Sequence, residues 1–251
     1  MRKNDMKRRL KAGEVLLGAF NTLHAPSVLE ILGLVGLDFV IVDAEHTSIT
    51  PETAEDLYRA AELRELSVVT RIGENSQQVI QKFMDAGSQG VLIPLVNTVE
   101  EAQRVVDAVK YPPIGKRGLA GSRSAEWGLT SIPADYVTES NLETLIAVQI
   151  ETKEGIENFD EIVTVNDVDV IFFGPSDIST SLGYPGELRH PEVLSIIETL
   201  GGKSISAGKS VGTIARDRAE IQYWKDRGFQ WLCTGVSGFL TNGIRSYISD
   251  S

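Results

Sequence analysis

Short apolar runs rich in β-branched residues alternate along the chain with longer stretches of helical period, and this alternation limits the possible folds more than any other feature. Eight of the runs have the length of a strand, at 15–20, 38–44, 67–72, 90–95, 145–151, 169–175, 210–214 and 231–236. Several of them are apolar without interruption, which is typical of strands that are covered on both faces. The pattern therefore predicts a parallel sheet with helices packed outside it.

Eight strand–helix units in 251 residues predict a (β/α)8 TIM barrel, an α/β fold, formed by residues 1–251 as one domain. The main alternative is a doubly wound open sheet, which usually has a glycine-rich loop after its first strand. The first loop here, "NTLHAPS", has no glycine, so we favour the barrel. A polar N-terminal segment is expected to be helical. The irregular stretch 111–141 is expected to be a lid, a binding loop or a partner contact.

The composition argues against several classes of protein. The 35 acidic residues outnumber the 24 basic ones, and the resulting net charge of −11 disfavours nucleic acid and anionic membranes as partners. The single cysteine, Cys233, excludes an internal disulfide and a cysteine zinc cluster, and its apolar neighbours predict that it is buried. No apolar run reaches the roughly 18 residues that span a bilayer. Because no apolar segment follows the basic N-terminus, we expect a cytoplasmic protein.

Polar side chains gather where the predicted strands end, which is where a barrel has its active site. They follow the second, third, fifth and sixth strands, and comprise Asp43, Glu45, His46, Arg71, Gln149, Glu151, Ser176 and Asp177. The first and fourth strands end in mostly apolar residues. The sequence therefore predicts a polar site at the carboxyl end of the barrel.

Glu151 and Asp177 follow neighbouring predicted strands, whose axes lie roughly 5 Å apart. Two carboxylates this close repel each other unless a proton or a cation lies between them. Oxygen ligands without a cysteine cluster suit a hard divalent ion such as Mg²⁺ or Mn²⁺. The alternative is that both are ordinary loop carboxylates, one of which caps the next helix.

Arg71 and His46 carry the other chemistry of the predicted site. The planar guanidinium of Arg71 can bind an oxyanion or a carboxylate. His46 is the only histidine at a strand end and is a candidate general base, with Asp43 expected to orient its ring. His24 and His190 stand beside prolines and are expected to be structural. No lysine occupies a strand end, which argues against a Schiff-base mechanism.

Six motifs carry a resemblance to a known family: "LDFVIVDAEH", "RI" at 71–72, "DAGSQGVLIP", "YPPIGKRG", "VQIET" and "FFGPSDISTSLGYPG". In this order they resemble the HpcH/HpaI family of 4-hydroxy-2-oxoheptanedioate aldolases, metal-dependent class II pyruvate aldolases. The resemblance implies reversible aldol cleavage of a 4-hydroxy-2-oxo acid into pyruvate, or a close analogue, and an aldehyde. It also implies a divalent ion, Mg²⁺, Mn²⁺ or Co²⁺, as cofactor.

The resemblance implies a role for each residue at the strand ends. Glu151 and Asp177 match the family's metal ligands. His46 matches its catalytic base, Asp43 the partner of that histidine, and Arg71 the arginine that contacts the keto oxygen and stabilises the enolate.

The substrate contacts follow in the same way. The backbone at Ser176 and Asp177 would bind the pyruvate carboxylate, Gln149 would lie near the metal, and Arg123 would contact the aldehyde half. The family's usual residues are replaced at positions around the pocket mouth, at Phe20, Ala44, Thr47 and Tyr184, so the identity of the aldehyde stays open. The resemblance further implies a homo-oligomer, a hexamer, whose C-terminal helix packs on a neighbouring subunit.

Two alternatives for the function remain open. A lyase for acyl-CoA or phosphorylated substrates on the same barrel would need an anion site near "TGVSGF" at 234–239. A non-catalytic barrel would bind oxo acids without turning them over, because a fold does not by itself specify a function.

Overall fold

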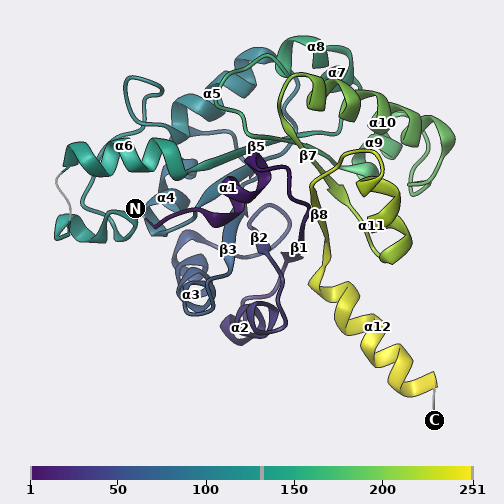
Figure 1. Cartoon of the computed structure of the whole chain (residues 1–251), viewed down its shortest axis with the longest axis horizontal. Helices are drawn as coiled ribbons and strands as arrows, with labels where there is room; N and C mark the ends of the chain where they lie inside the picture. The colour runs from purple at the N-terminus through teal and green to yellow at the C-terminus, as the bar shows by residue number, and fades with distance from the viewer. Residues whose placement is uncertain (1, 131–132, 250–251) are drawn as a thin grey trace.

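Eight parallel strands close into a barrel in chain order, with β8 pairing back onto β1, in a computed structural model that describes residues 2–130 and 133–249 (Figure 1). The strands are β1 (Leu16–Asn21), β2 (Phe39–Asp43), β3 (Ser67–Arg71), β4 (Gly90–Ile93), β5 (Leu145–Ile150), β6 (Val170–Phe173), β7 (Ser210–Ile214) and β8 (Trp231–Gly235). Each lies within its predicted run or extends one residue beyond it. The prediction of a TIM barrel is confirmed.

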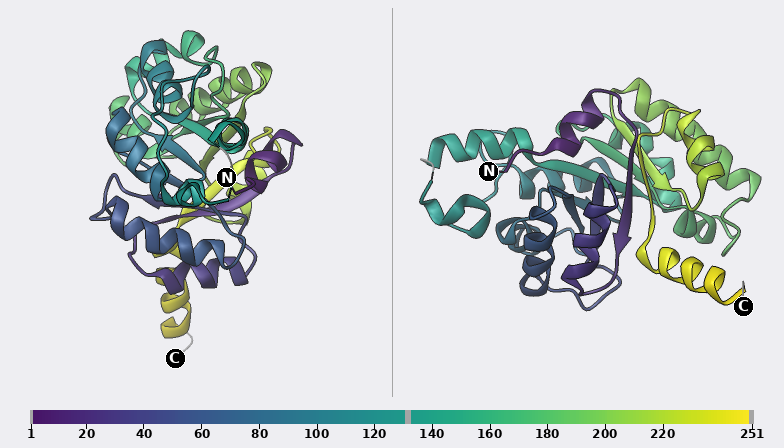
Figure 2. Two further views of the ribbon diagram at one scale, coloured as in Figure 1. Left: turned by 90° about the vertical axis from the view of Figure 1, so that its left-hand side faces the viewer. Right: turned by 60° about the horizontal axis from the view of Figure 1, so that its bottom comes forward.

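Helices surround the barrel on its outer side (Figures 1 and 2). They are α1 (Asp5–Lys11), α2 (Pro26–Leu34), α3 (Pro51–Glu62), α4 (Gln77–Ala86), α5 (Val99–Val109), η1 (Arg123–Gly128), α6 (Pro133–Glu143), α7 (Lys153–Glu157), α8 (Phe159–Ile162), α9 (Pro175–Ser181), α10 (Pro191–Ser206), α11 (Arg218–Lys225) and α12 (Val236–Ser249). Two helix ends have local signals in the sequence: Thr50 accepts from the backbone of Thr53 to begin α3, and Gly87 ends α4 at φ 124°.

Large aromatic side chains fill the inside of the barrel. Phe39 and Trp231 stack with ring centroids 4.8 Å apart, and Gly18 makes room for them, because a Cβ there would lie 2.4 Å from the Phe39 ring. Helix α1 covers the amino end of the barrel, where the Trp231 indole donates to Met6 Sδ at 3.3 Å. The interior is thus a packed core, and polar side chains that follow β2, β3 and β5 lie at its carboxyl end.

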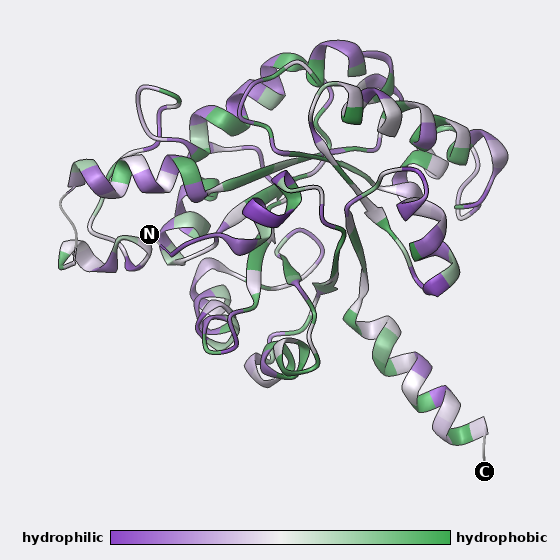
Figure 3. Ribbon diagram, in the orientation of Figure 1, coloured by the Kyte–Doolittle hydropathy of each residue, from purple (hydrophilic) through white to green (hydrophobic). Residues whose placement is uncertain are grey.

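A second core lies between the strands and the helices, where outward-facing strand residues meet the apolar faces of the helices. Figure 3 shows this division, with hydrophobic strands inside and helices that alternate in hydropathy around them. Cys233 is buried, as predicted, and burial raises the pKa of its thiol.

The stretch 111–141 differs from the prediction of an irregular loop. It contains η1 and most of α6, and a small separate core of Tyr111, Ala125 and Tyr136 holds the two helices together. The helix α6 was missed because it buries mainly Tyr136 and Ser140 on its inner side. Its apolar pattern is therefore weak.

Helix α12 leaves the carboxyl end of β8 and extends away from the barrel (Figures 1 and 2). Within it only Val236 is buried, while Tyr247 is 83% exposed. In the described part of the chain, no helix combines the length and the apolar character that a membrane span requires.

Candidate active site

Asp43 and Arg71 form the centre of the polar site. They end β2 and β3, and the sheet register places them directly opposite each other. Arg71 donates twice to the carboxylate, from Nε to Oδ1 at 2.9 Å and from Nη2 to Oδ2 at 2.6 Å. Burial disfavours the charged guanidinium, yet the hydrogen bonds and charge of Asp43 raise the pKa of Arg71 above its usual value. This arginine is therefore charged and fixed in direction.

The structure corrects one expectation about Asp43. Its carboxylate binds Arg71 and accepts from the backbone N–H groups of Glu45 and His46, so it does not orient the His46 ring. The His46 ring instead has Nε2 at 3.5 Å from Glu45 Oε2, and its side chain is 66% exposed. His46 lies at the rim of the site, beside Glu45.

Glu45 is the site residue to which the sequence analysis assigned no role. Its Oε2 lies 3.2 Å from Arg71 Nη1, and this oxygen is buried without a hydrogen bond. Burial raises the pKa of Glu45, and the charges of Arg71 and His46 oppose that rise. The Phe20 ring covers another side of Arg71, with Cζ at 4.8 Å from the ring centroid. The sequence feature that could have indicated a role for Glu45 is its position at the same strand end as His46.

Glu151 follows β5 and is buried, with 3% of its surface exposed. It accepts from the Leu95 backbone N–H at 2.8 Å and from the Gln149 side chain. Burial raises the pKa of Glu151 to about 7; its hydrogen bonds oppose this and the charge of Asp177 adds to it. Gly174 is necessary here, because a Cβ would lie 2.7 Å from Glu151 Oε2.

Asp177 and Ser176 lie in the first turn of α9, directly after β6, and both are exposed. The charge of Asp177 acts on both Glu151 and Glu45, so three carboxylates share one electrostatic environment. Within residues 2–130 and 133–249, no three His, Cys, Asp or Glu side chains converge closely enough to hold a metal ion by themselves. Glu151 and Asp177 are the two carboxylates at this end of the barrel that could hold a cation together with water and substrate oxygens.

The donor set fits a hard divalent ion. Gln149 Oε1 is buried with no hydrogen-bond partner, which leaves one more oxygen at the site without an interaction. A buried carboxylate whose pKa is raised is also one that a bound cation would stabilise in its charged form. Mg²⁺ commonly binds one or two carboxylates and completes its shell with water and substrate oxygens.

Arg123 does not join this cluster within the chain. Its guanidinium donates to Glu62 at 3.1 and 2.5 Å and to the Ala86 carbonyl at 2.9 Å. Those residues end α3 and α4, just before β3 and β4 begin, so Arg123 lies at the amino end of the barrel. The prediction that it binds the aldehyde half gains no support from its position.

Of the other two histidines, His190 has the structural role that we expected. His190 Nδ1 accepts from the Glu192 backbone at the start of α10, and its ring stacks on Tyr184 at 3.6 Å. His24 is exposed in the loop after β1.

A closed barrel with an arginine and carboxylates at its strand ends is typical of TIM-barrel enzymes. A model of the HpcH/HpaI aldolase/citrate lyase family matches residues 16–242, and the chain belongs to this family. It is an enzyme of the aldehyde-lyase class. The family resemblance of its motifs is confirmed.

Named relatives and solved structures agree with this assignment. The chain is 37% identical to the 2-keto-3-deoxy-L-rhamnonate aldolase of Escherichia coli (strain K12) over 94% of this chain and 88% of that protein. The HpcH/HpaI aldolase from Desulfitobacterium hafniense DCB-2 superposes with a TM-score of 0.92 at 31% identity, covering 98% and 95% of the two chains. The citrate synthase SbnG does so with a TM-score of 0.89 at 28% identity, covering 98% and 96%.

Proposed function

We propose that this enzyme catalyses a divalent-metal-dependent, reversible aldol cleavage of a 4-hydroxy-2-oxo acid into pyruvate, or a close analogue, and an aldehyde. The observation that carries the proposal is the bidentate Asp43–Arg71 pair, which fixes a charged guanidinium at the barrel end that also bears Glu151 and Asp177. A cytoplasmic location belongs to the same proposal.

Glu151 and Asp177 would hold the metal ion, with Gln149 beside it. When bound there, a divalent ion supplies a Lewis acid that polarises the 2-oxo group and offsets negative charge. The backbone N–H groups of Ser176 and Asp177 would receive the carboxylate of the oxo acid at the start of α9.

Arg71 would stabilise the charge that develops on the keto oxygen. Asp43 takes two of its five N–H groups and Glu45 lies against Nη1, so Arg71 keeps further N–H groups for the substrate. Because Asp43, Glu45 and Phe20 already fix the guanidinium, little reorganisation is needed when the enolate forms.

His46 would accept the proton of the C4 hydroxyl while the C3–C4 bond breaks. The electron pair of that bond passes toward C3 and the keto oxygen, and the aldehyde leaves. The carboxylate of Glu45, 3.5 Å from Nε2, stabilises the protonated ring. His46 is exposed, which lets it exchange the proton with solvent or return it to the enolate.

The relatives named 2-keto-3-deoxy-L-rhamnonate aldolase indicate which substrates to try first. That compound is a 4,5-dihydroxy-2-oxo acid, and cleavage between C3 and C4 turns the C4 hydroxyl into the aldehyde carbonyl, so we expect a short aldehyde half that keeps a single hydroxyl group. Pyruvate with hydroxylated aldehydes should also react in the synthetic direction.

We also propose that α12 packs on a neighbouring subunit of a homo-oligomer, a hexamer by the family resemblance. Apolar side chains on it are exposed, among them Phe239 (44%), Leu240 (51%) and Ile244 (57%). Ile31 and Leu34 of α2 and Val35 directly after it are exposed as well, and burying the two surfaces together would remove apolar area from water. Light scattering of the Ile244→Asp variant, compared with the unaltered chain, tests this.

The function is tested by following pyruvate release from 2-keto-3-deoxy-L-rhamnonate and simpler 4-hydroxy-2-oxo acids with lactate dehydrogenase. The enzyme is first stripped with EDTA, and Mg²⁺, Mn²⁺ or Co²⁺ is then restored. We expect no turnover in EDTA and recovery with metal. Full activity in EDTA would remove the metal from the proposal.

Two variants and a matched control extend the test. Glu151→Gln and Asp177→Asn should lose metal-dependent turnover, whereas Glu157→Gln, an exposed carboxylate on α7, should not. If oxo acids bind but no acid or aldehyde is turned over with any metal, the chain is a binding barrel rather than an aldolase.

A further inference from the structure

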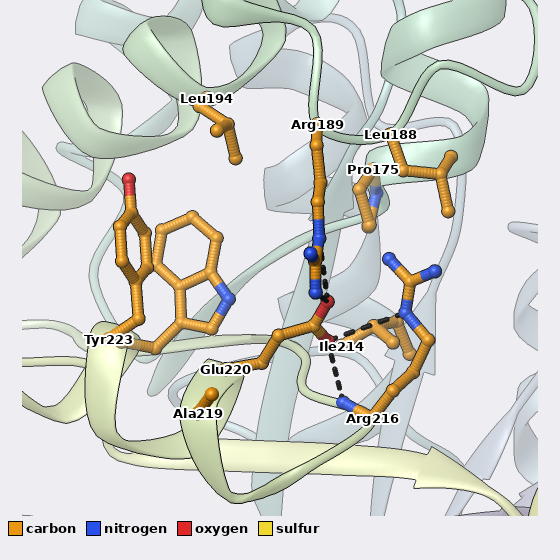
Figure 4. Close-up of a pocket in the computed structure, with 10 residues that line it drawn as sticks. Pro175, Leu188, Arg189, Leu194, Ile214, Arg216, Ala219, Glu220 and Tyr223 are labelled. Carbon is orange, nitrogen blue, oxygen red and sulfur yellow. Dashed lines mark hydrogen bonds and ion pairs between the residues drawn. The ribbon is translucent and has the colours of Figure 1, made fainter.

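A cavity of about 250 Å³ lies outside the barrel between α10, α11 and the end of β7 (Figure 4). Its walls are largely apolar and include Leu194, Ile214, Tyr223 and Trp224. Pro175, the residue before Ser176, also lines it, so the cavity lies toward the carboxyl end of the barrel. None of the residues that line it belongs to the polar site described above.

Two arginines line this cavity and share one carboxylate (Figure 4). Arg189 donates from Nε and Nη2 to Glu220 Oε1, at 3.2 and 2.7 Å. Arg216 has Nε at 3.3 Å from Glu220 Oε2 and donates its backbone N–H to the same oxygen at 2.7 Å. Both oxygens of Glu220 are thus occupied, and it balances only one of the two positive charges.

The guanidinium of Arg216 keeps its two terminal nitrogens for another partner. Its contacts in the described part of the chain are made by Nε and the backbone, and Figure 4 shows its end directed toward Pro175 and Leu188. Glu187 and His190 lie with Arg216 along an adjoining hollow. Glu187 in this hollow and Asp217, whose negative charge acts on Arg189, are carboxylates that would oppose an anion there.

We propose that this cavity, the arginine-rimmed pocket, binds a small organic carboxylate with an apolar tail. The carboxylate would accept from the terminal nitrogens of Arg216, and the tail would lie against Leu194, Tyr223 and Trp224. A benzene ring fills an apolar cavity of about 150 Å³, so the pocket has room for a ring with a short acidic side chain. The proposal is separate from the aldolase site and stands whether or not the aldol cleavage is confirmed.

The pocket is tested by calorimetric titration of the full-length chain with 3-phenylpropionate. EDTA is present throughout, so that the acid has no metal ion to bind at the aldolase site. The neutral 3-phenylpropanol, of nearly the same shape, is titrated in parallel. We expect the acid to bind about tenfold more tightly than the alcohol, the scale of a hydrogen bond to a charged group.

Four variants test whether the acid binds in the arginine-rimmed pocket. Arg216→Ala should reduce the affinity for the acid to that for the alcohol and leave the alcohol unchanged. Ala219→Phe, an exposed lining position, fills the cavity and should abolish binding of both. Glu187→Gln should tighten binding of the acid by about twofold. Arg104→Ala, on α5, removes the same charge elsewhere and should change nothing.

The proposal is overturned if neither compound binds. It is also overturned if the acid binds Arg216→Ala and Ala219→Phe as tightly as it binds the unaltered chain. Equal binding of acid and alcohol that is lost in Ala219→Phe would overturn the carboxylate as the ligand class. Because Arg216 and Ala219 are both exposed, circular dichroism should show that these variants are folded.

Discussion

Asp43 and Arg71 lie opposite each other on β2 and β3 and are joined by two hydrogen bonds, of 2.9 and 2.6 Å. The residues are 28 positions apart in the chain, and the register of two parallel strands is what brings them together. The pair fixes the direction of a charged guanidinium at the carboxyl end of the barrel.

Replacing Asp43 tests what the pair contributes to stability. Asp43→Asn leaves the largely buried Arg71 without its main counter-charge, and we expect the free energy of unfolding to fall by about 3 kcal/mol. Urea denaturation measures this. Glu55→Gln removes a carboxylate from the exposed pair with Arg59 and should cost less than about 0.5 kcal/mol. Equal losses in the two variants would contradict the prediction.

Arg71→Lys tests the chemical role of the same arginine. Lysine keeps the charge but cannot make the planar bidentate contact, so the charge would no longer be fixed where the enolate forms. We expect kcat to fall about a hundredfold, with a smaller change in KM. Steady-state pyruvate release measures both constants, with Arg59→Lys as control. An unchanged kcat would exclude Arg71 from the reaction.

Gly174→Ala tests whether Glu151 must hold its observed position to bind metal. A Cβ would lie 2.7 Å from Glu151 Oε2 and 3.1 Å from Gln149 Nε2, and both side chains would have to move. We expect metal affinity to fall by about 10- to 100-fold, measured by calorimetric titration with Mn²⁺. Gly202→Ala, in α10 with open space around it, is the matched control. Wild-type affinity in Gly174→Ala would argue against Glu151 as a ligand.

The lowered pKa of Lys110 predicts how the free energy of unfolding depends on pH. Burial lowers the pKa of Lys110 to about 7, and the nearby charge of Lys7 adds to this. The unfolded chain, with the ordinary value of 10.5, then binds more protons than the folded one between pH 7 and 10.5. Stability contributed by this group should therefore rise with pH through that window and stay flat below it.

Lys110→Met should abolish most of that rise, whereas Lys225→Met, on the exposed side of α11, should preserve it. Denaturation midpoints between pH 7 and 10 provide the measurement. If the unaltered chain and Lys110→Met show the same pH dependence, Lys110 is charged in the folded state and the assignment fails.

The fold was predictable because its signals are local. Each strand is indicated by a run of apolar residues. Thr50 begins a helix through its side chain, and Gly87 ends one through its backbone conformation. The helix α6 was not predictable, since much of what it buries is polar or small and its partner Tyr111 lies far back along the chain. The site was predictable only as a set of residues at the strand ends, because the active site of such a barrel lies at the carboxyl ends of its strands.

The sequence by itself determined that eight strands alternate with helices and that polar residues follow four of them, because side-chain pattern and chain direction suffice for both. Only the tertiary structure decided which partner each polar group has: Asp43 binds Arg71 rather than the ring of His46, and Arg123 binds Glu62 at the opposite end of the barrel. Those pairings depend on strand register and on packing between distant segments. The spacing of residues along the chain does not reveal the strand register or the packing between distant segments.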